Sequence, residues 1–392
     1  MNDLPKLELK RGHDRRLRAG SPWIFANEVA MTPEVRALPA GTLARLALPG
    51  GRFYGLVHVN PHALIVARLL TRNLDAAIDA RFFARRLERA LALRERFLPG
   101  GFYRLIHGEA DGLPGLVVDR YGDVVVVQPN TAGMDDALDA ILDAVHRVLA
   151  PRGVVVRTDG RARGREELAL TSPRVEGEVA RPLAGREGAL AFLADPVEGQ
   201  KTGWFFDQRP NRETIRGLAS GARVLDLYSY AGGFALAALA GGAAWVHAVD
   251  RSAPALALAE RAAGRPDALH AETGEVMDVL GRLTAEKARF DIVVADPPPF
   301  ARAKKDAAPA AHAYRKLARA AAGVTAPEGL LAVASCSHHV GEAALVGATF
   351  HGLRDAGRAG RLVATGGAGP DHPLHPALPE SRYLSFLLYA LD

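Results

Sequence analysis

The chain has 392 residues, of which 48% are hydrophobic and 24% charged, so it has material for a core and length for two or three domains. This balance excludes a disordered tail or a fibrous protein. Its single cysteine excludes an internal disulfide, the polar opening MNDLPKLELK lacks the apolar segment of a secretory signal, and no apolar run is long enough to span a bilayer. We therefore expect a globular protein of the cytoplasm.

The net charge of +5 is concentrated near the start of the chain. Residues 1–72 carry eleven Lys and Arg against five Asp and Glu, a net of +6, which leaves −1 for the rest. Short strand-like runs, TLARLAL and LIVARLL, stand there between turn signals, so we expect a small β-rich domain over 1–72. A solvated positive face is the ordinary explanation of such a charge, and a surface that neutralises RNA phosphates is the functional one.

Residues 73–190 predict an α+β domain. From Asp75 to Phe97 the apolar residues keep helical spacing, which predicts one amphipathic helix that ends at PGG. Strand-like LPGLVVDRYG and VVVVQPN, a helix through MDDALDAILDAVHRVLA and the strand VVVRT come next. A polar passage from Gly160 to Gly188, rich in Gly and Arg, then leads to the strand-like AFLADP.

The third domain, 191–392, alternates strands and helices from about Gly221. Strand-like RVLDLY, WVHAVD, FDIVVADP and LLAVASC alternate with helical stretches over 234–239, 253–263 and 311–322. This order predicts an α/β fold with a mainly parallel sheet and helices on both faces. Ligands of such sheets bind outside the carboxyl ends of the strands.

Two of these strand ends have the features of a nucleoside-binding site. In VLDLYSYAGGF, Asp226 lies on the strand, and Gly232 and Gly233 let the following helix approach a ligand closely. The stretch is not the G-x-G-x-x-G dinucleotide motif. Asp250 ends the next strand, where an acid can hold the two hydroxyls of a ribose, although it could equally cap the helix that follows.

The stretch ADPPPF places an acid and an aromatic at the end of a third strand. Asp296 can bind the edge of a flat base, the prolines stiffen the turn, and Phe300 can lie near a face of the base. Strand termination explains the prolines but not the acid beside them. Cys336 ends a fourth strand, and a shared sheet edge would bring it towards Asp296. A lone Cys is usually a small buried hydrophobe, and the sequence leaves open whether His338 and His339 lower its pKa.

Together, DLYSYAGGF, the acid of HAVD, ADPPPF and SCSHH resemble the S-adenosylmethionine-dependent 23S ribosomal RNA cytosine-C5 methyltransferases of the bacterial I-type. GQKTGWFFDQRPNR, from Gly199 to Arg212, is similar to the segment before that family's methyltransferase core. DHPLHPALPESRYL, from Asp371 to Leu384, is similar to its C-terminal signature, and LKRGHDRRLRAGSPWIFANEV resembles its PUA RNA-binding domain. The resemblance spans nearly the whole chain and implies a Rossmann-like methyltransferase domain after a PUA domain and a central α+β domain.

The resemblance also implies the cofactor and the roles of individual residues. S-adenosylmethionine would be the cofactor, 23S rRNA the partner, and no metal would be needed; a homodimer is left open. Cys336 would add to C6 of cytosine, which makes C5 nucleophilic, while Asp296 hydrogen-bonds the N3 side. The implied cofactor residues are Gln208, Arg209, Asp226, Tyr228, Gly232, Asp250, Glu275 (with Asp278 as a competitor) and Asp296, and the implied substrate residues are Pro297, Pro298 and Phe300.

Two other functions remain open at this stage. A D-P-P-aromatic turn also serves methylation of the exocyclic amino group of adenine or guanine, which needs no cysteine. An RNA-binding protein without activity would use Cys336 only as a core residue. Some relatives carry the reactive cysteine in the D-P-P turn, but here that turn has none, which leaves Cys336 as the candidate. The target nucleotide and the base that removes the C5 proton are not readable from the sequence.

Overall fold

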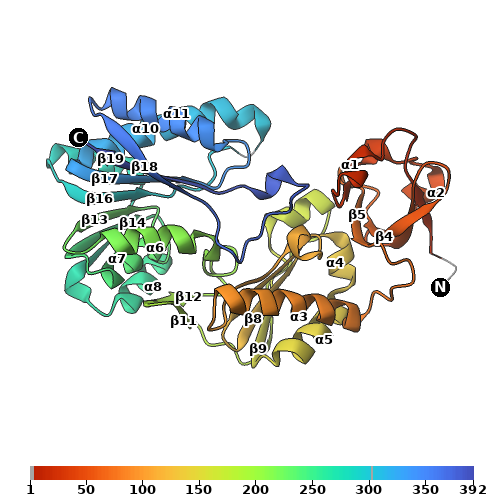
Figure 1. Cartoon of the computed structure of the whole chain (residues 1–392). Helices are drawn as coiled ribbons and strands as arrows, with labels where there is room; N and C mark the ends of the chain where they lie inside the picture. The colour runs from red at the N-terminus through yellow and green to blue at the C-terminus, as the bar shows by residue number, and fades with distance from the viewer. Residues whose placement is uncertain (1–3, 302) are drawn as a thin grey trace. The chain divides into compact units, whose positions relative to one another are not determined.

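The computed structural model describes residues 4–301 and 303–392. Its chain divides into two compact units, Met1–Ala180 with Pro370–Ser381 and Arg181–Gly369 with Arg382–Asp392 (Figure 1). Residues 370–381 belong to the first unit because Asp371 is bound there: its side chain accepts from the backbone N–H of Arg104 at 3.1 Å, and its carbonyl accepts from Arg94 at 3.3 Å. The division into three domains over 1–72, 73–190 and 191–392 stays a prediction, since the structure separates two units.

The first unit begins with a five-stranded sheet in the order β1-β3-β4-β5-β2. Its alternating apolar residues form a core of their own, which includes Leu7, Ile24, Leu46 and Val57. The elements are β1 (Lys6–Glu8), α1 (Arg15–Arg18), β2 (Trp23–Ile24), α2 (Pro33–Arg36), β3 (Leu43–Ala47), β4 (Phe53–Val59) and β5 (Ala67–Thr71).

A second sheet, in the order β10-β9-β8-β7-β6, completes the first unit. Its strands are β6 (Phe102–His107), β7 (Leu116–Tyr121), β8 (Val124–Pro129), β9 (Gly153–Val156) and β10 (Arg174–Gly177), and its helices are α3 (Ala80–Phe97), α4 (Ala132–Asp136) and α5 (Leu138–Leu149). Helix α3 begins at Ala80 rather than near Asp75, because the Asp79 side chain accepts the backbone N–H of Phe82 and caps it. The single helix predicted over MDDALDAILDAVHRVLA is two helices, and the turn between them at Ala137 carries no Gly or Pro that would mark it.

The second unit is built on a seven-stranded sheet in the order β15-β14-β13-β16-β17-β19-β18, which confirms the predicted Rossmann-like fold. Strands β13 to β17 are mutually parallel, and β19 runs antiparallel to both β17 and β18. Helices α10 and α11 lie on one side of the sheet and α6, α7 and α8 on the other (Figure 1). The strands are β13 (Arg223–Leu227), β14 (Trp245–Asp250), β15 (Leu269–Thr273), β16 (Phe290–Ala295), β17 (Thr325–Ser335), β18 (Gly360–Gly366) and β19 (Ser385–Leu391).

Among the described residues, a hairpin and six α-helices accompany this sheet. Strand β11 lies within the polar passage from Gly160 to Gly188, and its hairpin partner β12 overlaps the strand-like AFLADP. The members are β11 (Leu183–Glu187), β12 (Leu190–Ala194), α6 (Arg209–Leu218), α7 (Gly233–Ala240), α8 (Ala253–Ala263), α9 (Val276–Ala285), α10 (Ala307–Val324) and α11 (Glu342–Asp355). Across 4–301 and 303–392, no helix is both long and apolar enough to cross a membrane.

Candidate active site

The register of the parallel strands aligns their carboxyl ends. Leu227 of β13 pairs with Val249 of β14 on one side and with Ala295 of β16 on the other, and Ala295 pairs with Val333 of β17. The residues that follow these pairs, among them Asp250, Asp296 and Cys336, therefore lie along one edge of the sheet. We call this edge, with Asp226 and the β13–α7 turn, the strand-end site.

The turn between β13 and α7 has an unusual backbone. Tyr228 and Tyr230 adopt positive φ angles of 62° and 50°, which side-chain-bearing residues rarely do. Gly232 also has a positive φ, and a Cβ there would come within 2.5 Å of the Cβ of Ala259. Such strain persists only where surrounding contacts impose it, and it gathers at ligand sites.

Asp226 anchors this turn from the buried end of β13. Its Oδ2 accepts the Ser229 hydroxyl at 2.6 Å and the backbone N–H of Ala235 at 2.8 Å. Its Oδ1 is buried and has no hydrogen-bond partner among the described residues. Burial raises the pKa of Asp226 to about 7 despite these two bonds, and the charges of Asp296 and Asp250 add to the rise. A cationic ligand beside Oδ1 would satisfy the oxygen and stabilise the charged form.

Asp250 and Glu275 lie at the next two strand ends. The Asp250 carboxylate accepts the backbone N–H of Tyr230 at 2.9 Å and that of Ser252 at 2.8 Å, so it braces the turn. Glu275 precedes α9, is exposed, and lies 3.4 Å from Arg251. Burial and then the charge of Glu275 raise the pKa of Tyr228 to about 12, which places Glu275 near that ring. The competitor Asp278 is exposed on the first turn of α9.

A chain of amides holds Asp296. Gln208 Nε2 donates to Asp296 Oδ2 at 2.9 Å, and Asn211 Nδ2 donates to Gln208 Oε1 at 2.6 Å. Asn211 also donates to the carbonyl of Gly367 at 3.2 Å. Burial and the nearby charge of Asp207 raise the pKa of Asp296 to about 7. Gln208 was predicted from the sequence and Asn211 was not, although Asn211 stands one helical turn after Gln208.

Cys336 follows the last residue of β17, and the serines on either side fix the chain around it. Ser335 Oγ accepts the Tyr314 hydroxyl at 2.8 Å and the backbone N–H of Ser337 at 3.3 Å. Ser337 Oγ donates to the carbonyl of Ala301 at 3.1 Å. The two serines therefore hold the turn around Cys336, whose thiol is free and half-buried.

The surroundings of Cys336 favour the protonated thiol at neutral pH. Burial raises its pKa to about 11; the charge of Lys201 lowers it, and those of Asp296 and Asp207 raise it. These effects place Lys201, Asp296 and Asp207 close to the thiol. His338 and His339 are both exposed.

Lys201 and Asp207 are site residues that the sequence analysis did not single out. Asp207 Oδ2 accepts the Tyr383 hydroxyl at 2.6 Å and lies 3.5 Å from Lys201 Nζ. Lys201 and Asp207 both lie in the GQKTGWFFDQRPNR stretch, and Tyr383 lies in the C-terminal DHPLHPALPESRYL stretch. These two family-like motifs therefore contained the residues that the prediction left out. The two motifs meet at the strand-end site, although 176 residues separate Asp207 from Tyr383.

The remaining predicted residues take different positions. Arg209 lies 3.7 Å from Glu187, whose carboxylate also binds Arg212 at 2.6 Å, so Arg209 belongs to a buried ionic group and its role towards a cofactor remains a prediction. Phe300 packs against Tyr314 with ring centroids 4.8 Å apart. In the turn before it, Pro297 is buried and Pro298 is exposed.

The strand-end site fits the cofactor that the resemblance implies. S-adenosylmethionine carries a sulfonium and an ammonium group, and the unpartnered Oδ1 of Asp226 is a buried acceptor for positive charge. The positive φ of Gly232 lets the amino end of α7 approach closely, where unpaired N–H groups suit the carboxylate of the same molecule.

Known proteins that resemble this chain are methyltransferases that use the cofactor expected at the strand-end site. Residues 7–72 match a family of PUA-like domains, and residues 171–357 match S-adenosylmethionine-dependent methyltransferases. The chain is 35% identical to a ribosomal RNA large subunit methyltransferase of Deinococcus radiodurans over 99% of this chain and 97% of that one. It is 33% identical to ribosomal RNA large subunit methyltransferase I of Shewanella denitrificans, over 98% of each.

Solved structures show the same fold. A methyltransferase complexed with SAH is 20% identical and superposes with a TM-score of 0.83 over 99% of this chain and all of that one. A SAM-dependent methyltransferase from Streptococcus mutans, also 20% identical, gives a TM-score of 0.82 over the same coverage. The cofactor is S-adenosylmethionine, as the matched methyltransferase family requires. The chain belongs to the ribosomal RNA large subunit methyltransferase family.

Proposed function

We propose that this protein methylates C5 of a cytosine in 23S ribosomal RNA, with Cys336 as a covalent nucleophile. The observation that carries the proposal is the position of Cys336: its thiol lies at the strand ends beside Asp296, while the serines on both sides take the structural hydrogen bonds. A cysteine that served only the core would not need a charged lysine and two acids around it.

In this proposal the strand-end acids and the turn bind the cofactor, which supplies an electrophilic methyl group. Asp226 would bind its positive charge through Oδ1, Asp250 the ribose, and Glu275 the adenine, with Tyr228 and Gly232 shaping the pocket. Gln208 and Arg209 complete the proposed set. Pro297, Pro298 and Phe300 would guide the flat base towards Asp296.

Asp296 has the protonation that this chemistry needs. N3 of cytosine carries a lone pair, so a group that binds it must donate a hydrogen bond, and only a protonated carboxyl can. The pKa of about 7 makes that form available near neutral pH. We propose that Asp296 donates to N3 as the sulfur adds to C6, so that the electron pair of the C5–C6 bond becomes available at C5.

The rest of the reaction follows from this adduct. The thiol first gives its proton to solvent, and the charge of Lys201 stabilises the resulting thiolate. C5 then takes the methyl group from the sulfonium, which leaves as a neutral thioether. A base removes the C5 proton, and the electron pair of that C–H bond re-forms the C5–C6 double bond and expels the thiolate. The proton at N3 returns to Asp296 and the expelled thiolate takes a proton from solvent, so the enzyme is regenerated.

One observation favours a second candidate, methylation of an exocyclic amino group. The pKa of about 11 for Cys336 favours the thiol, which is a poor nucleophile, and amino-group methylation needs no such nucleophile. The proposed reaction therefore depends on activation of the thiol when RNA and cofactor are bound. A non-catalytic RNA-binding protein is less consistent with the two perturbed acids at the site.

The test is methyl transfer from labelled S-adenosylmethionine to large-subunit RNA without modifications, followed by digestion and identification of the nucleoside. We expect 5-methylcytidine from the wild type and a loss of at least about 1,000-fold in Cys336→Ala, because the nucleophile is removed. Unchanged cofactor binding by Cys336→Ala is the control for folding. A methylated amino group, with activity that survives the substitution, would establish the second candidate instead.

The PUA-like match and the names of the relatives support an RNA substrate. Identification of 23S rRNA as that RNA belongs to the proposal. A homodimer and a cytoplasmic location remain predictions.

A further inference from the structure

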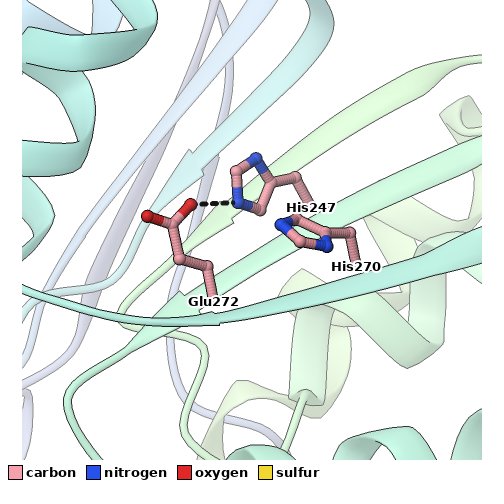
Figure 2. A group of neighbouring side chains, drawn as sticks. All are labelled: His247, His270 and Glu272. Atoms are coloured by element: carbon pink, nitrogen blue, oxygen red, sulfur yellow. Dashed lines mark hydrogen bonds and ion pairs between the residues drawn. The ribbon is translucent and has the colours of Figure 1, made fainter.

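Two histidines and a glutamate meet on adjacent strands, apart from the strand-end residues. His247 of β14 pairs directly with His270 of β15, and Glu272 stands two residues further along β15 on the same face. Figure 2 shows the two imidazole rings and the carboxylate gathered together. One ligand atom from each residue can be chosen so that all three lie within 4.8 Å of one another.

The surroundings of this cluster hold its members in place. His247 is 3% exposed, and its Nε2 lies 2.8 Å from Glu272 Oε2. Trp245 stacks parallel to His270 with ring centroids 6.2 Å apart. Arg282 of α9 donates to the same Glu272 oxygen at 2.6 Å.

One carboxylate oxygen of Glu272 remains available to coordinate a metal ion. Both hydrogen bonds of Glu272 to other described residues use Oε2, so Oε1 is available to an ion. Arg282 supplies the outer-shell hydrogen bond that orients a ligating carboxylate in metal sites. His270 is exposed, so an ion can enter from solvent.

We propose that His247, His270 and Glu272 bind a zinc ion, with water as the fourth ligand. Two imidazoles and one carboxylate suit Zn²⁺, whereas Mg²⁺ and Ca²⁺ prefer oxygen ligands throughout. Zn–N distances of about 2.0–2.1 Å in a tetrahedron put ligand atoms about 3.3 Å apart, so the side chains must close by no more than about 1.5 Å. The exposed His270 and the partly exposed Glu272 can make that movement.

The ion would join the edge strand β15 to β14 and, through Arg282, to α9. It would therefore stabilise the edge of the sheet rather than take part in methyl transfer. The family resemblance implied no metal. His247 and His270 lie 23 positions apart in the sequence, and the pairing of β14 with β15 brings them together.

The test is calorimetric titration of the metal-stripped full-length protein with Zn²⁺. We expect one ion per chain and a higher melting temperature with Zn²⁺. His270→Gln and Glu272→Gln should each weaken binding at least about 100-fold, since loss of an outer-shell partner alone costs about 10–100-fold. His351→Gln, which changes an exposed histidine of α11, is the matched control and should bind as the wild type does.

Other outcomes would overturn the proposal. One is no stoichiometric binding by the wild type; another is equal binding by the wild type and both cluster variants. A third is a Co²⁺-substituted protein whose spectrum shows a thiolate charge-transfer band that Cys336→Ala removes, since the ion would then lie at the cysteine. Circular dichroism of the cluster variants separates loss of binding from loss of fold, and no part of the test depends on methyl transfer.

Discussion

Asp226 and Asp296 show how burial prepares single residues for a reaction. Each stands at a strand end where desolvation raises its pKa to about 7, and the charge of Asp296 adds to the rise at Asp226. At neutral pH each carboxyl is therefore present in both forms. We propose that Asp226 is used as the anion, beside a cationic cofactor, and Asp296 as the acid, beside N3 of cytosine.

The hydrogen bond from Gln208 tunes this balance at Asp296. It stabilises the carboxylate and so lowers the Asp296 pKa against the effect of burial. In Gln208→Leu the pKa should rise further above 7. Because the reaction needs protonated Asp296, the alkaline decline of kcat/KM should move to higher pH, while the maximal rate falls as the carboxyl loses its orientation.

The measurement is kcat/KM for methyl transfer between pH 6 and 9. Gln200→Leu, at an exposed glutamine of the same segment, is the control and should leave the profile unchanged. A decline that moved to lower pH in Gln208→Leu would contradict the assignment of Asp296 as the acid.

At the scale of elements, the turn between β13 and α7 is the most constrained segment of the site. Tyr228, Tyr230 and Gly232 have positive φ angles within five residues. The bonds to Asp226 and Asp250 impose this path. The turn is thereby preorganised before a cofactor binds, which reduces the cost of binding.

Gly232→Ala tests that constraint. The new Cβ would meet both an unfavourable φ and the Cβ of Ala259, so we expect a loss of about 2–4 kcal/mol in the free energy of unfolding. Gly264→Ala is the matched control: its φ is also positive, at 61°, but nothing lies within 4 Å of its Cβ position. It should cost only about 1–2 kcal/mol.

Urea unfolding of the two variants, with cofactor binding measured in parallel, provides the comparison. Equal losses of stability would show that the contact with Ala259 contributes nothing. Cofactor binding should weaken in Gly232→Ala and stay unchanged in Gly264→Ala.

The sequence predicted which residues stand at the strand ends, but it did not predict the distant contacts and the backbone conformation that hold those residues in place. Asp226, Asp250, Asp296 and Cys336 could be placed on one edge because parallel strands connected by helices share a direction. The contact of Asn211 with Gly367 spans 156 residues, and no local pattern predicts which distant loop meets a helix. The strained φ of Tyr228 was likewise hidden, since nothing in its residue type calls for it.

At the scale of the whole molecule, the distribution of charge supports an RNA substrate. The net charge of +6 over residues 1–72 contrasts with −1 over the rest of the chain. In the structure, Arg11 and Arg15 are exposed, the latter on α1, whereas Arg68 is bound to Glu166 at 2.7 Å. The PUA-like domain therefore uses some of its arginines for structure and presents others to solvent.

Arg11→Ala with Arg15→Ala should weaken RNA binding at low salt and flatten its salt dependence. Each lost phosphate contact should reduce the slope of log K against log salt by about 0.7–0.9, because fewer counterions are released. Filter binding to large-subunit RNA over a range of salt concentrations measures this slope. Arg289→Ala, an exposed arginine before β16, is the control; a slope that is the same in all three proteins would argue against the PUA-like domain as an RNA contact.

The covalent role of Cys336 is tested most directly with RNA that contains 5-fluorocytidine. Fluorine replaces the C5 proton that a base must remove, so the thiolate cannot leave after methyl transfer. The wild type should therefore form an RNA–protein complex that survives denaturing electrophoresis when S-adenosylmethionine is present, and Cys336→Ala should form none. Methylation of ordinary RNA by the wild type, with no trapped complex on the fluorinated RNA, would contradict the covalent mechanism.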